Sequence, residues 1–370
     1  MTRCAVVAAT FAALMLGAVA PAPAHAGRSA PSRAGGNACP PSARALAYSD
    51  ALDKYTSNGA TLGGLSSIAY DSRAHAYVSA VDNNGTDPAR LWFYRDLGSP
   101  HVVGAPLVLR RPDGTPYNGE DSDNEGLGVL PDGDYIVSSE TEPSIRIYGR
   151  NGVQQSSLPV PARFAVTGST PAGEATSNAT LEGLTVAPGG REVIASMEGA
   201  LSGDTSAAGD DTYHRMLVYR AGRHGTWQLI TQLGYRTDPG HRIPEVAAYS
   251  ADSMFVEEAS YAAATGNEVK LFVVHGIGAA RDVSAVPNLS AAPARDIVHK
   301  TLVADLVQCP TLGAPAKETQ ANPLLDNFEG MAVTGSFGPR SYGVTLISDD
   351  NFSPTQTTRL LDLEVRVPRR

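Results

Sequence analysis

Short apolar runs separated by turn residues follow one another along most of the chain. One stretch passes from 126–130 through the turn Pro131-Asp132-Gly133 to further runs at 135–137, 145–148 and 153–160. A second stretch keeps the same order, with runs at 184–187, 193–196, 216–219 and 227–233. Runs of this length bounded by Gly, Pro and Asp predict β-strands, and no convincing amphipathic helix interrupts them. The pattern predicts an all-β protein.

The same unit recurs with a carboxylate at the start of its first strand and another at the end of its second. The copies are Glu125 with Glu140, Glu182 with Glu198, Glu245 with Glu257, Glu329 with Asp349, and a weaker one from Leu65 to Asp82. Repetition at this period is typical of repeat architectures. Four antiparallel strands per unit, repeated around a circle, predict a β-propeller. We expect five blades, with inner strands near residues 65, 126, 183, 246 and 330, while 276–305 leaves room for a sixth.

The last unit supplies three clear strands, the third within 358–367, so we expect 45–55 to add the outer strand and close the ring.

Residues 1–26 resemble a signal peptide, with an apolar stretch and the cleavage pattern Ala24-His25-Ala26. We expect 27–43 to be flexible and 44–370 to form the propeller. An exported chain favours a disulfide between Cys39 and Cys309 near the seam, the alternative being two separate buried thiols.

The charge balance limits the partners. The chain has 38 acidic and 29 basic side chains and a net charge of −9. Nucleic acids and anionic membranes need a basic footprint, so neither is expected as a partner. No stretch after the signal is long and apolar enough to span a membrane. We therefore expect a secreted monomer that acts on a small molecule.

The repeated carboxylates should meet at one end of the ring. In an antiparallel meander, the start of the first strand lies beside the end of the second. The longest connections fall at the same end, and such loops often carry function. Oxygen ligands without clustered His or Cys favour a hard cation, and loop carboxylates suit Ca²⁺. The expected ligands are Glu125, Glu182, Glu329 and Asp349, together with Glu245 and Asp82.

Salt bridging is the alternative interpretation of this end of the ring. A basic residue opens every third strand, namely Arg90, Arg146, Arg215, Lys270 and Arg359. These side chains could neutralise the carboxylates blade by blade. Both interpretations can hold together, with the arginines left free to bind a phosphate, for which the guanidinium fork is well shaped.

Several ordered motifs resemble the secreted phytase-like family described by an esterase-like activity of phytase. They are Asp123-Asn124-Glu125-Gly126, Leu181-Glu182-Gly183-Leu184, Phe328-Glu329-Gly330-Met331, Ser348-Asp349-Asp350-Asn351-Phe352 and an opening block at 63–71. The likeness runs from about residue 60 to 365. It implies a propeller-like fold and an activity on phosphate or carboxylic esters. Pro244-Glu245-Val246 departs from the Glu-Gly pattern, which weakens the case for Glu245.

The leading hypothesis is a secreted, calcium-dependent phosphoester hydrolase. A metal-bound water would attack phosphorus, Arg146, Arg215 or Arg359 would bind the phosphate oxygens, and Glu140 or Glu198 would act as general base. The alternative is a non-catalytic, calcium-stabilised binding propeller outside the cell. A carboxylic esterase would need a nucleophile, and the sequence has no G-x-S-x-G motif.

Overall fold

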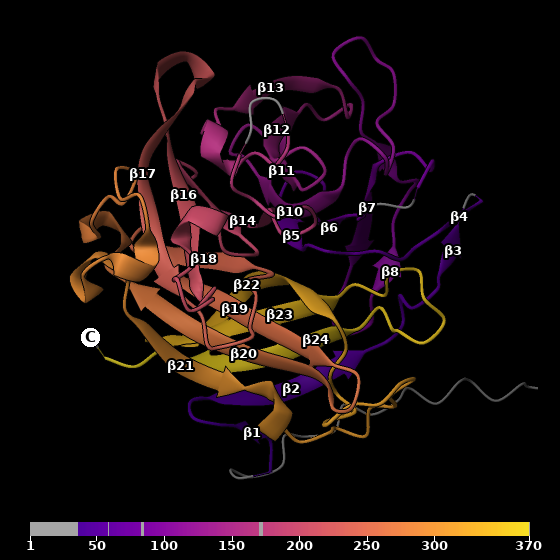
Figure 1. Cartoon of the computed structure of the whole chain (residues 1–370). Helices are drawn as coiled ribbons and strands as arrows, with labels where there is room; N and C mark the ends of the chain where they lie inside the picture. The colour runs from indigo at the N-terminus through magenta and orange to yellow at the C-terminus, as the bar shows by residue number, and fades with distance from the viewer. Residues whose placement is uncertain (1–35, 58, 83–84, 170–172, 370) are drawn as a thin grey trace, which may run out of the picture. The chain divides into compact units, whose positions relative to one another are not determined.

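The computed structural model describes residues 36–57, 59–82, 85–169 and 173–369. The signal peptide expected at 1–26, and residues 27–35 of the expected flexible segment, lie outside this range. Five antiparallel sheets in the compact unit Asn37–Arg370 form the blades of a propeller, as predicted (Figure 1). The described part of the chain has no α-helix, only short 3₁₀ turns. None of its helical segments has the length and hydropathy of a membrane span.

Each of blades two to four is a simple four-stranded meander. Blade two contains β10 (Asn124–Val129), β11 (Tyr135–Ser139), β12 (Ser144–Tyr148) and β13 (Gln154–Leu158). Blade three contains β14 (Leu181–Val186), β15 (Glu192–Met197), β16 (Tyr213–Ala221) and β17 (Trp227–Arg236). Blade four contains β18 (Val246–Ser250), β19 (Ser253–Ala262), β20 (Gly266–His275) and β21 (Lys300–Asp305). The sixth blade that we considered at 276–305 is therefore wrong, because this stretch holds three 3₁₀ turns and β21, the outer strand of blade four.

Blade one contains β5 (Ala69–Asp71), β6 (Ala76–Ala80), β7 (Arg90–Arg95) and β8 (His101–Val102), and β9 (Leu107–Val108) also pairs with β7. Leu65 extends its inner edge through a bridge to Val81. A separate hairpin joins β3 (Thr56–Ser57) to β4 (Ala60–Thr61). The inner strand of blade one is thus shorter than those of the other blades, which fits the weak copy of the repeat there.

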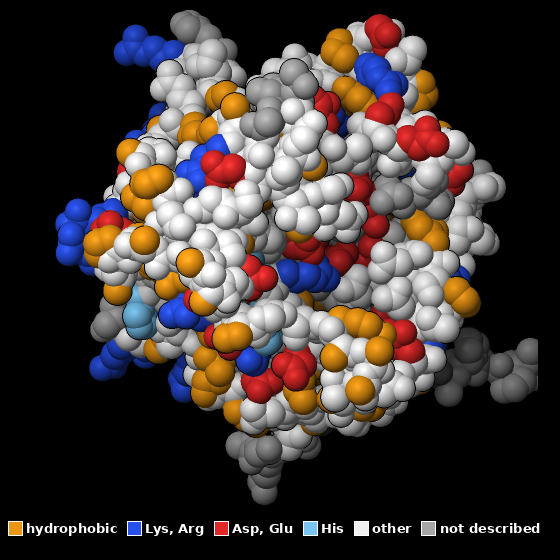
Figure 2. All heavy atoms as spheres, viewed as in Figure 1, with side chains coloured by type: hydrophobic (Ala, Val, Ile, Leu, Met, Phe, Trp, Pro, Cys, Tyr) orange, Lys and Arg blue, Asp and Glu red, His pale blue; other side chains and the backbone are white. Residues whose placement is uncertain are grey.

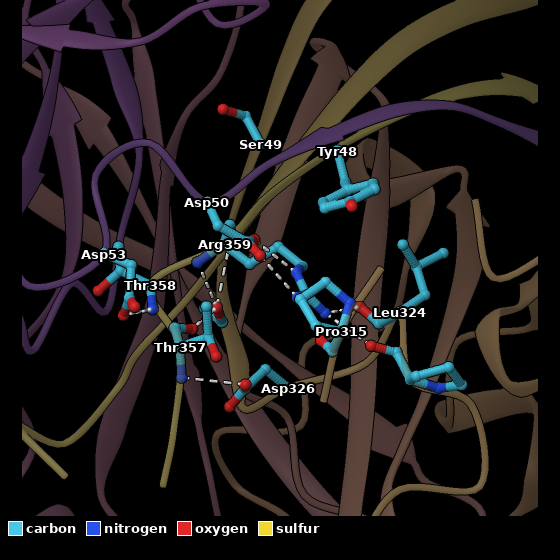
Figure 3. A network of polar contacts seen from close by, with 12 residues as sticks. Tyr48, Ser49, Asp50, Asp53, Pro315, Leu324, Asp326, Thr357, Thr358 and Arg359 are labelled. Atoms are coloured by element: carbon cyan, nitrogen blue, oxygen red, sulfur yellow. Dashed lines mark hydrogen bonds and ion pairs between the residues drawn. The ribbon is translucent and has the colours of Figure 1, made fainter. Parts of the chain in front are cut away.

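Blade five is built from both ends of the chain. It contains β22 (Phe328–Gly338), β23 (Ser341–Ser348) and β24 (Leu360–Arg366), and β2 (Ala43–Ser49) pairs with β24 as the predicted closing strand. Outside β2 lies β1 (Ala38–Cys39). The predicted disulfide joins Cys39 to Cys309. In the same blade, Arg359 Nε and Nη2 donate hydrogen bonds to the two carboxylate oxygens of Asp50, at 2.7 and 2.9 Å (Figure 3).

Apolar side chains fill every junction between blades. The buried residues in the described part of the chain form five clusters, and each cluster contains residues from two neighbouring blades. Ile136 of blade two and Leu184 of blade three share one cluster, and Leu65 of blade one and Ile347 of blade five share another. Because burial of apolar surface is the main stabilising term, the ring is held together by contacts between sheets as well as within them.

Glycines of the Glu-Gly pairs let inner strands approach one another. A Cβ atom on Gly126 would lie 2.4 Å from the backbone nitrogen of Leu184 in the next blade. A Cβ atom on Gly183 would lie 2.7 Å from the Cα atom of Glu245. Since both distances are shorter than any real Cβ contact, a larger residue would push the strands apart. Glycine at these two positions therefore allows the glutamates of neighbouring blades to lie close together at this end of the ring.

Candidate metal centre

Acidic residues from all five blades interact at one mouth of the propeller. Figure 2 shows acidic side chains gathered in a hollow near the centre of one face, with basic side-chain atoms among them. Burial, together with the negative charge of Glu329 or of other acids nearby, raises the pKa values of Asp82, Glu125, Glu140, Glu182, Glu198, Glu257 and Asp349. The structure thus brings together the inner-strand and second-strand carboxylates of different blades.

Two overlapping sets of carboxylates have the spacing of cation ligands. Asp82, Asp123 and Glu125 each offer an oxygen within 4.8 Å of the others, and Glu125, Glu140 and Glu182 do the same. Glu125 belongs to both sets. All of these donors are oxygen atoms, as a hard divalent cation such as Ca²⁺ requires. The residues present therefore fit a metal ion of that class.

Burial makes these carboxylates hard to ionise without a cation. Burial, with a hydrogen bond to Asp123 and the charge of Asp349, raises the pKa of Asp82 to about 11. Burial and the neighbouring Glu198 raise the pKa of Glu140 to about 8. Burial and the neighbouring acids raise the pKa values of Glu125 and Glu182 well above the ordinary range. Positive charge placed among these groups would lower the cost of ionising them together.

Asp123 was not among the predicted site residues. It lies two positions before Glu125, next to the start of β10, and is almost fully buried. Residues at i and i+2 of an extended chain share one side. The Asp-x-Glu spacing at 123–125 is therefore the signal in the sequence that predicts Asp123 beside Glu125.

The predicted ligands from blades four and five differ in their surroundings. Burial and the nearby Glu329 raise the pKa of Asp349 well above the ordinary range, and its Oδ1 accepts a hydrogen bond from the Asn351 backbone at 2.6 Å. Glu245 instead directs Oε1 to the backbone N–H groups of Leu184, at 2.7 Å, and Val246, at 2.9 Å. Neither Glu245 nor Asp349 belongs to the two close sets of described residues. Glu245 holds the junction between blades three and four.

Arg242 is the main site residue that sequence reasoning missed. Its Nη1 lies 3.0 Å from Glu198 Oε1 and 3.3 Å from Glu182 Oε1, and its Nη2 lies 2.9 Å from Glu329 Oε1. Asn327 Oδ1 accepts a further bond at 2.8 Å. The guanidinium thus partly neutralises carboxylates of blades three and five. Arg242 lies in the loop before β18, outside the third-strand positions where basic residues recur, so no repeat pattern marks it.

The three arginines predicted to bind phosphate have other partners. Arg215 is fully buried, bonds both oxygens of Asp204 at 2.6 and 2.8 Å, and donates to the carbonyls of Val283 and Val286. Arg359 is also fully buried and bonds Asp50 together with the carbonyls of residues 315, 323 and 324 (Figure 3). Arg146 donates to Ser122 Oγ at 3.0 Å and lies over the ring of Tyr117. These contacts hold the long loops of the mouth face in place.

The other basic third-strand residues also pair away from the two carboxylate sets. Lys270 bonds Asp238 at 2.9 Å, and Arg90 lies 3.6 Å from Asp87. The basic residues of the third strands therefore do not neutralise the mouth carboxylates blade by blade. Among the described residues, the one basic side chain bonded to several mouth carboxylates is that of Arg242.

A family model described as phytase-like, with esterase-like activity of phytase, matches residues 60–352. The chain belongs to this family. The Glu-Gly pairs and the Ser-Asp-Asp segment of this phytase-like chain, which supply the mouth carboxylates, all lie within the matched range. A comparison with curated proteins gave no match.

Solved structures similar to this phytase-like chain have low sequence identity. A protein of unknown function from Dyadobacter fermentans is 10% identical, with 88% of this chain and 100% of that chain covered and a TM-score of 0.46. The PQQ-bound aldose sugar dehydrogenase from Streptomyces coelicolor is 14% identical, covers 82% and 80%, and has a TM-score of 0.38. An α-L-arabinofuranosidase from Podospora anserina is 8% identical, covers 86% and 95%, and has a TM-score of 0.41. At these scores the likenesses carry no argument about function.

Proposed function

We propose that the acidic mouth binds Ca²⁺ and that the protein hydrolyses phosphoesters there. The observation that carries this proposal is the pair of overlapping carboxylate sets that share Glu125. Membership of the phytase-like family supports ester hydrolysis as the class of reaction. Ca²⁺ is favoured over Mg²⁺ because the donors are many, all oxygen, and placed on strand ends and loops of different blades.

Two sets of residues would hold Ca²⁺, namely Asp82, Asp123 and Glu125, and Glu125, Glu140 and Glu182. Glu329 and Asp349 lie close enough to add negative charge or a further ligand. A bound Ca²⁺ supplies positive charge for the phosphoryl oxygens and activates water for attack. Glu245 is assigned to the blade junction, because backbone N–H groups already occupy one of its oxygens.

Arg242 and Glu198 are the residues that we assign to the substrate. Arg242 contacts mouth carboxylates of blades three and five, and a guanidinium is suited to binding phosphoryl oxygens. Glu198 lies outside both ligand sets, and burial raises its pKa, so it is the better placed of the two candidate bases to accept a proton from water. Arg146, Arg215 and Arg359 would contribute by holding the surrounding loops.

We also propose that the protein acts outside the cell as a monomer. The signal-like sequence at 1–26 supports export, and the Cys39–Cys309 disulfide fits an oxidising compartment. Cell fractionation with an antibody against the mature chain tests this. Recovery of the full-length chain from the cytoplasm alone would contradict it.

A phosphomonoester assay with and without EGTA tests the activity. We expect turnover in CaCl₂, loss of turnover in excess EGTA, and recovery when Ca²⁺ is added back. Glu125→Gln should abolish this response, whereas Glu120→Gln, which changes an exposed carboxylate, should leave it intact. Calcium-dependent stabilisation with no hydrolysis of any ester would favour the binding propeller instead. Full turnover in EGTA would remove the metal from the proposal.

A further inference from the structure

A cavity of about 350 Å³ opens beside the mouth, between blades three and four. Glu198 and Arg242 form the wall that it shares with the acidic cluster. The other side chains that matter are His214 of β16, His241 and Tyr261. The volume is large enough for a six-membered ring with its substituents. A substrate whose reacting group lies at the mouth would place its remaining atoms here.

The cavity has no excess of positive charge. The guanidinium of Arg242 is already bonded to three carboxylates. The exposed Asp211 and the carboxylate of Glu198 both line the cavity. Burial holds His214 neutral by lowering the pKa of its imidazole to about 4. A ligand with several negative charges would therefore be repelled.

The cavity wall also carries polar side chains, among them the carboxylate of Asp211 and the imidazole of His241. In the described part of the chain, His241 Nε2 is buried and has no hydrogen-bond partner. The carboxylate nearest to His241 Nε2 is that of Glu268, at 3.8 Å. Hydroxyl groups both donate and accept hydrogen bonds, so they suit carboxylates and imidazoles in either tautomer.

Tyr261 adds a flat apolar surface to the same cavity. Its side chain is 61% exposed, which is the largest exposure among the large apolar residues described. The exposed ring of Tyr261 can stack on an apolar face of a ligand, and the carboxylates beside it can accept hydrogen bonds from the hydroxyls of that ligand. This combination is suited to a ring that has an apolar face and hydroxyl substituents.

We propose that this cavity binds the uncharged, hydroxyl-bearing ring of a sugar-type phosphomonoester and rejects rings that carry further phosphates. The proposal rests on the proposed function, in that the phosphoryl group is taken to lie at the mouth. In the reaction, the oxygen of water bonds to phosphorus, and the bond from phosphorus to the ester oxygen that bridges it to the sugar breaks. The ring leaves as an alcohol, taking up the proton that water has lost.

Binding of a phosphate-free probe tests the cavity without any hydrolysis. We expect methyl α-glucoside to bind the full-length protein, measured by saturation-transfer NMR, and Tyr261→Ala to weaken binding about tenfold. Tyr70→Ala is the matched control, because Tyr70 is 52% exposed and does not line this cavity. Equal binding by both variants, or binding of choline but no glucoside, would overturn the proposal.

Kinetics separate this proposal from the hydrolase activity itself. We expect kcat/KM to be higher for glucose 6-phosphate than for glycerol 2-phosphate or inositol hexakisphosphate. Tyr261→Ala should lower it about tenfold for glucose 6-phosphate and leave glycerol 2-phosphate unchanged. Hydrolysis without preference for the hexose ester refutes the cavity assignment and leaves the hydrolase standing. Glucoside binding that depends on Tyr261, without hydrolysis of any ester, supports the cavity and refutes the hydrolase.

Discussion

Arg242 Nη2 donates to Glu329 Oε1 at 2.9 Å and so links the loop before blade four to the inner strand of blade five. Through Nη1 the same side chain contacts Glu182 and Glu198 of blade three. One basic residue therefore connects three blades at the acidic mouth. Arg242 thus supplies part of the positive charge that the mouth carboxylates need, and the proposed Ca²⁺ would supply more.

Replacing Arg242 should destabilise the metal-free protein more than the calcium-bound one. Arg242→Gln removes positive charge from three largely buried carboxylates, which costs about 3 kcal/mol of unfolding free energy. Added Ca²⁺ should recover part of this loss. Urea unfolding in EGTA and in CaCl₂ measures both values. The same loss under both conditions would mean that Arg242 and the metal do not share ligands.

Removing the metal should lower stability by an amount that depends on its concentration. A ligand present at about 100 times its Kd stabilises the folded state by about 2.7 kcal/mol. We expect EGTA to remove this contribution from the wild-type protein. Glu125→Gln should lose most of the response, because Glu125 belongs to both ligand sets. Thermal unfolding at several Ca²⁺ concentrations checks this, with Glu120→Gln as the exposed control.

The Arg359–Asp50 pair should matter for stability rather than for catalysis. Arg359 is fully buried, and Asp50→Asn would leave its charge with only carbonyl partners. Loss of one partner of a buried pair costs about 3–5 kcal/mol. Arg44→Gln is the control, because its pair with Glu364 is exposed and long, at 3.8 Å. Turnover per folded molecule should be unchanged in Asp50→Asn. A large fall in turnover would instead indicate that Arg359 takes part in substrate binding.

His214 should contribute to acid sensitivity. Its side chain is fully desolvated, so its pKa falls to about 4 in the folded protein, with Asp211 opposing and Lys300 reinforcing the effect. The unfolded chain takes up the proton more readily, so the stabilising effect of the neutral ring is complete above pH 6.5 and is lost as the pH falls toward 4. This amounts to about 3 kcal/mol at most.

Unfolding free energies of the wild type and His214→Gln between pH 4 and pH 7 measure this contribution. The variant should show a flatter dependence on pH over this window. His101→Gln, which changes an exposed ring, should match the wild type. A variant curve that runs parallel to that of the wild type would exclude the assignment.

Local sequence was enough to predict the blades and the shared mouth. Turn residues bound each strand, and the carboxylates recur at fixed places within the repeat, so the sequence alone predicts that Glu125, Glu140 and Glu182 lie together. The incomplete last unit predicted the closing strand, and the presence of Cys39 and Cys309 in a chain expected to be exported predicted the disulfide.

Contacts between distant parts of the chain could not be predicted in this way. Arg242 lies 44, 60 and 87 residues from its carboxylate partners, and no periodic pattern connects them. The arginines at the third strands were visible, but many acids could have paired with them. Arg215 and Arg359 found Asp204 and Asp50, which lie outside the repeated positions. The stretch 276–305 has apolar residues that pack as 3₁₀ turns against an existing blade.

The missing side chains at Gly126 and Gly183 have a consequence for how this architecture can evolve. Backbone packing at these two positions fixes how narrow the ring is at its acidic end. Duplication of one blade would enlarge the circumference and move the carboxylate oxygens of different blades further apart. The number of blades is thus itself a determinant of which ligand the protein can hold, and a lineage could change it only by giving up this centre.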